Sequence, residues 1–255
     1  MVDFAQALSG FVIGIIVGVT GVGGGSLMTP VLVMLFGIHP ATAVGTDLLH
    51  AAITKAGGTV VHARNGNVEW AVVSRLAAGS VPAAVVTLLM LHHLDRGAGS
   101  SKIITTTLGV MLLLTAVTLI FRSQLRRLTR DRGVGAAYHP AFTVLTGAIL
   151  GIVVSLSSIG AGAIGITALF GLYPRLAASR IVGSDLAHAV PLALVAGFGY
   201  WLFGAVNWTL LGSLLVGSLP GIYVGSQLSG RLPELAQRSL LAITLSSVGV
   251  KLIAF

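Results

Sequence analysis

Apolar residues fill long stretches of the chain, and charged residues gather between these stretches. Stretches rich in Leu, Val, Ile, Ala and Gly fall at about 4–36, 41–62, 76–91, 103–121, 141–174, 181–203, 206–230 and 239–255. In lipid, the backbone groups of a segment must be satisfied within that segment, so each stretch predicts a membrane helix. The pattern therefore predicts an all-α polytopic membrane protein.

Two of these stretches are too long for one simple span. Residues 4–38 and 141–174 carry no formal charge. At about 1.5 Å per residue, each would exceed a hydrocarbon layer of about 30 Å. Small residues fill positions 21–26 and 155–162, in the middle of the two stretches, and glycine at such density breaks a helix. We therefore expect both stretches to be broken, re-entrant helices.

The chain contains an internal repeat. The run Gly45–Ala51 matches Gly183–Ala189 at an offset of 138 residues. The same offset relates three further pairs: Gly66 and Gly204, Trp70 and Trp208, and Gly79–Pro82 and Gly217–Pro220. We therefore predict two homologous transmembrane repeats, 1–121 and 141–255, joined by a basic cytoplasmic connector at 122–140.

The distribution of basic residues discriminates between two topologies. Four full spans per half give parallel repeats, with 8 basic residues inside and 6 outside. If the broken first segment of each half enters and leaves on one side, the second half is inverted, and the counts become 11 inside and 3 outside. The positive-inside rule favours inverted repeats, which are a common transporter design.

The composition excludes several classes of protein. Hydrophobic residues make up 55% of the chain and charged residues only 9%, whereas soluble domains carry about 25% charged residues. Cysteine is absent, which removes disulfides, thiolate metal sites and Cys nucleophiles. The net charge of +8 fits membrane topology better than nucleic-acid binding, because no aromatic residues are interleaved with the basic run. The N-terminus has no basic region, so we expect no cleaved signal peptide.

Two acidic residues lie inside apolar stretches at matching repeat positions. Asp47 and Asp185 are each followed three residues later by a histidine, His50 or His188, on the same helix face. A charged Asp at a helix centre costs about 2.5–3.5 kcal/mol, so it needs a partner, a proton or a water-filled cavity. One interpretation is a midplane site with these four residues as proton carriers. The other is that each Asp caps a broken helix or bonds across helices, with no part in transport.

Further residues are candidates for holding an anion. Where a half-helix begins inside the membrane, its unpaired N–H groups and positive dipole end can bind an oxyanion. Lys55 lies about 80° around a helix from Asp47 and can reach the same cavity, whereas the second half has Ala193 at that place. The candidate substrate-binding residues are Gly23, Gly24, Gly25, Ser26, Thr46, Lys55, Ser157, Ser158, Gly160, Gly162 and Ser184.

The ordered motifs resemble those of the sulfite exporter TauE/SafE family, also called TSUP. The resemblance covers nearly the whole chain and rests on Gly21–Pro30, Gly37–Pro40, Ala43–His50, Gly66–Trp70 and their echoes in the second half. It implies a permease of the bacterial inner membrane for sulfite, thiosulfate, sulfoacetate or related organosulfur anions, driven by the proton gradient. It also implies a general involvement of the glycine-rich segments and of the two Gly-Thr/Ser-Asp motifs.

The sequence thus predicts a secondary transporter for proton-coupled export of a small sulfur oxyanion or an organosulfonate. Its expected partners are that anion, protons and the lipid bilayer, without nucleic acid or cofactor; a homo-oligomer stays open. A divalent metal transporter using the two Asp-x-x-His pairs is an alternative, and an anion channel is another. An enzyme is not expected, because no nucleophile–base pair or metal-activated water can be recognised.

Overall fold

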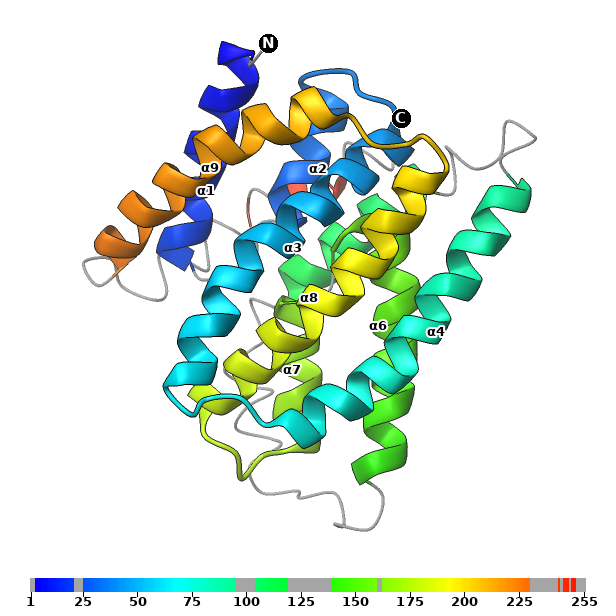
Figure 1. Cartoon of the computed structure of the whole chain (residues 1–255), viewed down its shortest axis with the longest axis vertical. Helices are drawn as coiled ribbons and strands as arrows, with labels where there is room; N and C mark the ends of the chain where they lie inside the picture. Colours follow the sequence, from blue (N-terminus) through cyan, green and yellow to red (C-terminus); the bar gives the residue numbers. More distant parts are fainter. Residues whose placement is uncertain are drawn as a thin grey trace.

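The described part of the chain is helical in a computed structural model that covers residues 3–20, 25–94, 104–118, 139–159, 162–229, 243, 245–247 and 249–250, and none of these residues forms a strand. An apolar helix covers Ile104–Thr118. The labelled helices are α1 (Phe4–Thr20), α2 (Gly25–Met34), α3 (Pro40–Arg64), α4 (Trp70–Leu94), α6 (His139–Ser157), α7 (Ala163–Leu172), α8 (Ala178–Leu202) and α9 (Trp208–Ser229) (Figure 1). The predicted all-α class is confirmed.

The two overlong stretches are each divided where the small residues lie. The first consists of α1 and α2, and the second of α6 and α7. At the second division the backbone enters the left-handed region, with φ +58° at Ser158 and +131° at Gly162. The half-helices α2 and α7 have 10 residues each, which gives them a length of about 15 Å, half of a hydrocarbon layer. The predicted helix breaks are confirmed.

The helices α3 and α8 lie side by side and run in opposite directions (Figure 1). The backbone N–H of Asn207, just beyond α8, donates to Oγ1 of Thr46 near the start of α3 at 3.1 Å. The backbone N–H of Glu69, just beyond α3, donates to Oγ of Ser184 near the start of α8 at 2.8 Å. These two bonds join positions related by the 138-residue offset, so each half holds the other in the same way.

Close glycine contacts join two further helix pairs, α1 with α9 and α4 with α6. Methyl groups added to these glycines would collide with backbone atoms of the opposite helix. Small residues allow such close approach between membrane helices. The glycines are Gly10, Gly14 and Gly18 on α1, Gly217, Gly221 and Gly225 on α9, Gly79 on α4, and Gly147 and Gly151 on α6.

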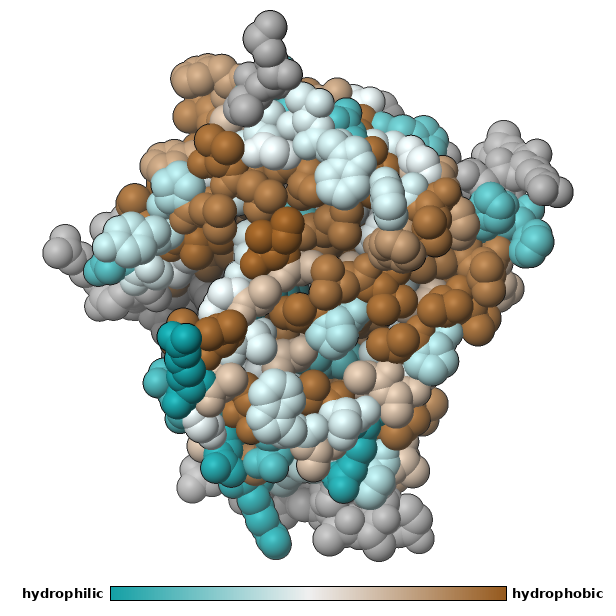
Figure 2. All heavy atoms as spheres, viewed as in Figure 1, coloured by the Kyte–Doolittle hydropathy of each residue, from teal (hydrophilic) through white to brown (hydrophobic). Residues whose placement is uncertain are grey.

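The face shown in Figure 2 is apolar over a broad central area, seen as brown atoms, and hydrophilic teal side chains lie at its lower end and at its upper right. Four described helices are long and apolar enough to cross a membrane: Trp70–His93, Pro140–Ser157, Ala178–Leu202 and Trp208–Gln227. Trp70 and Trp208, which match at the 138-residue offset, are exposed and begin α4 and α9. Helix α3 has 25 residues and turns polar side chains inward, Asp47, His50 and Lys55 among them.

The interpretation of the two acids as helix caps is wrong. Helix α3 begins at Pro40, where proline is favoured because its missing N–H would be unpaired anyway, and α8 begins at Ala178. Asp47 and Asp185 therefore lie two turns inside their helices. The physical reason is that each side chain interacts across helices, Asp47 with the Thr29 hydroxyl and Asp185 with Lys55. The local preference of aspartate for a helix start therefore does not decide the boundary.

Parts of the predicted organisation lie outside the described residues. These include most of the basic connector 122–140, since α6 begins at His139, and most of the last apolar stretch, 239–255. The repeat boundaries at 121 and 141 therefore stay predictions.

The glycine contacts predict a position-dependent effect of one methyl group. In Gly217→Ala, the new methyl overlaps the carbonyl oxygen of Ala7 on α1, so we expect a loss of about 1–3 kcal/mol in stability from overpacking. In Gly212→Ala on the same helix, the methyl meets no atom within 4 Å, so stability should hold or rise by the helix propensity of alanine, about 1 kcal/mol. Thermal unfolding of both variants in detergent checks this, and equal midpoints would contradict the packing.

Candidate functional site

Asp47 is fully buried in α3 and is held from a half-helix. The Thr29 hydroxyl of α2 donates to Oδ2 of Asp47 at 2.5 Å. Ser158, at the break between α6 and α7, faces the same carboxylate closely enough to interact with it. Its hydroxyl and Oδ1 of Asp47 make no hydrogen bond to the described residues. Helices of both halves therefore meet at the Asp47 carboxylate. The Ser158 hydroxyl and Oδ1 of Asp47 can still form further hydrogen bonds there.

The two histidines are fixed by serines of the opposite half. Nε2 of His50 in α3 lies 2.7 Å from Oγ of Ser218 in α9. Nε2 of His188 in α8 lies 2.8 Å from Oγ of Ser80 in α4. All four side chains are buried, and the two bonds again join positions related by the 138-residue offset. Each histidine is thus oriented by one nitrogen.

The second ring nitrogen of each histidine remains without a hydrogen bond to the described residues. For His50 this nitrogen, Nδ1, lies 3.8 Å from Oδ1 of Asp47, which is beyond hydrogen-bond length. The predicted i, i+3 pairing of Asp47 with His50 is confirmed as a spatial neighbourhood.

Lys55 links the two acidic residues electrostatically. Its side chain is buried, and it lies within electrostatic range of the carboxylates of both Asp185 and Asp47. It also lies within electrostatic range of His188. Asp185 and His188 come from α8, whereas Lys55 comes from α3. We call Asp47, His50, Lys55, Asp185 and His188 the buried polar cluster.

The hydroxyls of Thr46 and Ser184 are occupied by the inter-repeat bonds at opposite ends of the α3–α8 pair. Oγ of Ser184 also donates to the carbonyl of Arg180 at 2.7 Å. Beside it, the Arg180 guanidinium pairs with the Glu69 carboxylate at 3.1 Å on the surface. In the structure, Thr46 and Ser184 thus form hydrogen bonds that join α3 and α8 to the segments beyond the opposite helix. Their role in substrate binding stays a prediction.

The predicted residues of the two broken segments differ in their surroundings. Ser157 donates to the carbonyl of Val153 at 2.7 Å and accepts from the N–H of Ile159 at 3.2 Å, so it closes the end of α6. Gly162 precedes α7, and no side chain caps that helix start. Gly25 and Ser26 begin α2, while Gly23, Gly24 and Gly160 lie outside the described residues.

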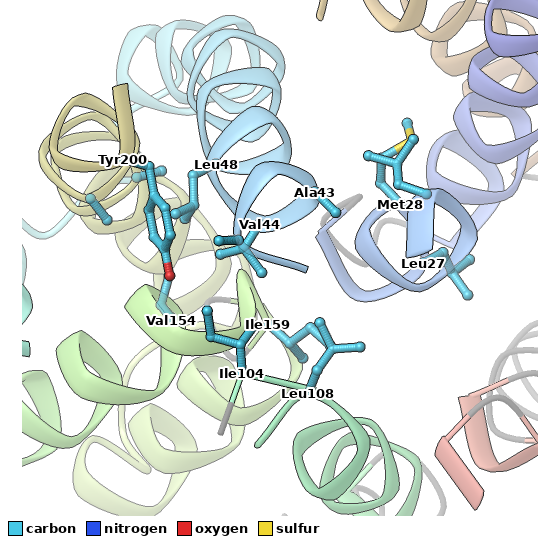
Figure 3. Close-up of a cluster of buried hydrophobic side chains, with 14 of the residues drawn as sticks. Leu27, Met28, Ala43, Val44, Leu48, Ile104, Leu108, Val154, Ile159 and Tyr200 are labelled. Atoms are coloured by element: carbon cyan, nitrogen blue, oxygen red, sulfur yellow. The ribbon is translucent and has the colours of Figure 1, made fainter. Parts of the chain in front are cut away.

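Buried apolar side chains of α2 and α3 pack together (Figure 3), and some of them neighbour the polar site residues in sequence. Val44 and Leu48 flank Asp47 on α3, Leu27 and Met28 precede Thr29, and all four are buried. Such surroundings keep the local dielectric low and strengthen every charge interaction among the polar groups.

A separate apolar groove of about 580 Å³ lies between α4 and α6. Its lining residues carry no titratable group, and the polar cluster takes no part in it. The lining residues are Gly79, Pro82, Ala83, Val86, Thr87, Met90, Leu91, Ala148, Ile152 and Leu156.

Three residues at the site were not predicted. Ser80 and Ser218 belong to the repeated Gly-Ser-x-Pro motif, so the repeat itself was a signal for them. Thr29 lies within the run Gly21–Pro30 but carried no signal of its own, because its partner Asp47 is 18 residues away in sequence and the contact depends on how α2 packs.

Comparison with known proteins identifies the family. The model of the family "Sulfite exporter TauE/SafE" matches residues 6–252. The chain belongs to the sulfite exporter TauE/SafE family. It is a multi-pass membrane transporter and not an enzyme.

Relatives of this TauE/SafE protein extend over nearly its full length. The probable membrane transporter protein YjnA of Bacillus subtilis is 38% identical over 250 residues, covering 96% of this chain and 98% of the relative. The probable membrane transporter protein YdhB of the same species is 30% identical over 256 residues, covering 95% and 97%. A probable membrane transporter protein of Xylella fastidiosa is 26% identical over 235 residues, covering 88% and 84%. No solved structure matches the chain.

The hydrogen bond from Thr29 to Asp47 predicts that loss of the hydroxyl destabilises the protein at Thr29 but less at the matching Thr167 of the other half. Thr29→Val keeps the side-chain shape but removes the donor to Asp47, so a buried carboxylate oxygen loses its partner. We expect a loss of about 1–3 kcal/mol in unfolding free energy.

Thr167→Val is the matched control, because Thr167 stands at the corresponding place in α7 and donates only within its helix, to the carbonyl of Ala163 at 2.7 Å. Chemical denaturation of the two variants compares them. An equal or smaller loss in Thr29→Val than in Thr167→Val would contradict the stabilising role of the Thr29–Asp47 bond.

Proposed function

We propose that this TauE/SafE protein is a secondary transporter that exports sulfite or a related small sulfur-containing anion from the bacterial cytoplasm, coupled to protons. The observation that carries the proposal is the convergence of Thr29 on α2 and Ser158 at the α6 break on Asp47, with Lys55 linking Asp47 to Asp185. Intramembrane charges of this kind face cavities or partners and mark transport pathways.

The anion is held between the two broken segments. The Lys55 ammonium supplies positive charge, and the uncapped start of α7 after Gly162 supplies backbone N–H groups at the positive end of a helix dipole. The Ser158 hydroxyl has an unused hydrogen-bonding capacity beside them. Gly23, Gly24 and Gly25 with Ser26 have the corresponding role at the start of α2, with Gly160 at the second break.

Protons are carried by Asp47, His50, Asp185 and His188. The bonds from Ser218 and Ser80 fix the two imidazole rings by Nε2, which leaves Nδ1 of each ring available. A ring nitrogen with a nearby carboxylate can exchange a proton near neutral pH.

The two halves, 1–121 and 141–255, form inverted repeats that rock against one another to alternate access. Support comes from the reciprocal bonds: His50–Ser218 and His188–Ser80 near the centre, and Thr46–Asn207 and Ser184–Glu69 at the ends. The antiparallel course of α3 and α8 fits a twofold axis in the membrane plane (Figure 1). The 122–140 connector is then cytoplasmic.

The metal-transport alternative has less support. Among the described residues, no group of three or more His, Asp or Glu side chains is placed to hold a metal ion. An anion channel differs from the proposal in its kinetics, since only a carrier gives saturable flux coupled to a gradient.

Flux measurements in proteoliposomes test the proposal. We expect saturable uptake of labelled sulfite or thiosulfate, reduced at least about tenfold in Lys55→Met, because a lost charge-assisted contact of about 1.5–3 kcal/mol corresponds to such a factor. Arg64→Met is the control, since it removes an exposed cation from the end of the same helix. Absence of protein-dependent flux for sulfite, thiosulfate and sulfoacetate would contradict the proposal.

A further inference from the structure

The formal charges of the buried polar cluster do not cancel. Two carboxylates, Asp47 and Asp185, face one ammonium, Lys55, and the position in α8 that matches Lys55 holds Ala193. With neutral histidines, the cluster has a net formal charge of −1.

The helices around the cluster do not supply the missing positive charge. Helices α1, α2, α7 and α9 contain no charged residue or histidine, and α6 contains only His139 at its first position. In α3, α4 and α8 the remaining charged residues and histidines lie within about two turns of a helix end: His62, Arg64, Arg75, His92, His93 and Arg180. Among the described helices, Lys55 therefore carries the positive charge that faces the two acids.

A net negative cluster disfavours an anion. Like charges repel strongly in a low-dielectric interior, and a second negative charge would add to the one already present. A proton taken up by Asp47, Asp185 or an Nδ1 atom of His50 or His188 removes this repulsion. By linkage, the anion then strengthens proton binding by the same factor by which the proton strengthens anion binding.

Because the proton and the anion strengthen each other's binding, they are expected to cross the membrane in the same direction. Exchange of an anion for a proton requires that the two compete, so that the loaded carrier crosses without the proton. Here the loaded and deprotonated carrier has the highest electrostatic energy, whereas the carrier holding both has its charges compensated.

We infer that the anion and at least one proton bind together in the buried polar cluster and cross in the same direction, so that the substrate leaves the cell as an anion with its proton. This inference rests on the proposed function and specifies its co-substrate. Export is then driven by the outward gradient of the anion and its proton, and an acidic exterior opposes it, in contrast to the export driven by the proton gradient that the family resemblance implies.

Accumulation in proteoliposomes tests the direction. Vesicles are equilibrated with radiolabelled sulfite or thiosulfate, the membrane potential is clamped to zero with potassium and valinomycin, and a gradient of about one pH unit is imposed. Co-transport predicts accumulation on the alkaline side, by about tenfold for each proton carried with the anion. Protein-free vesicles correct for passive entry of sulfite as a neutral acid, and thiosulfate avoids that path.

Two variants each make the formal charge of the buried polar cluster more positive by one unit, one by removing an acid and the other by adding a lysine. Asp185→Asn removes one negative charge, and Ala193→Lys adds the lysine that the repeat lacks. Both bring the formal charge of the cluster to zero, so each should need one proton fewer, and accumulation per pH unit should fall by about tenfold. Glu69→Gln removes an acid at the surface, outside the cluster, and should leave accumulation unchanged.

The outcomes separate this inference from the function beneath it. Accumulation on the acidic side, or equal distribution despite protein-dependent flux, would overturn co-transport but leave an anion transporter. An unchanged ratio in a correctly folded Asp185→Asn or Ala193→Lys would overturn the assignment of the proton to this cluster. Absence of protein-dependent flux with every probe would overturn the proposed function and the inference with it.

Discussion

A charge buried in an apolar interior must be paired or hydrogen-bonded, and the centre of this molecule is organised around that constraint. Asp47 would be costly alone in α3. It is accepted there because α2 stops short of spanning the membrane and brings Thr29 to it, while the α6 break brings Ser158. The breaks in the two apolar stretches thus place polar side chains at depth in the protein, where continuous helices would place aliphatic ones.

Close packing at the periphery makes this centre possible. Glycines let α1 approach α9, and α4 approach α6, almost to backbone contact. The serines that bond the histidines, Ser80 and Ser218, lie on α4 and α9, one position after Gly79 and Gly217. The same short motif therefore brings two helices together and orients a histidine on a third, which is a physical reason for its occurrence in both halves.

Much of the fold could be predicted from the sequence, because lipid imposes simple rules on composition. The all-α class and the division of residues 4–36 and 141–174 followed from apolar length and small residues. The helix-cap interpretation of Asp47 failed because a tertiary bond from Thr29 outweighed a local preference. The partners Ser218 and Ser80 lie 168 and 108 residues from their histidines, so only the folded arrangement of the helices reveals those bonds.

The account depends most on the electrostatic link between the two halves through Lys55. A double-mutant cycle of Lys55→Met and Asp185→Asn, followed by thermal unfolding of the purified protein in detergent, measures this link directly. The account predicts that the double variant is more stable than the sum of the single losses implies, with a coupling energy of about 1 kcal/mol or more. Additive losses, within about 0.3–0.5 kcal/mol, would contradict a shared cluster.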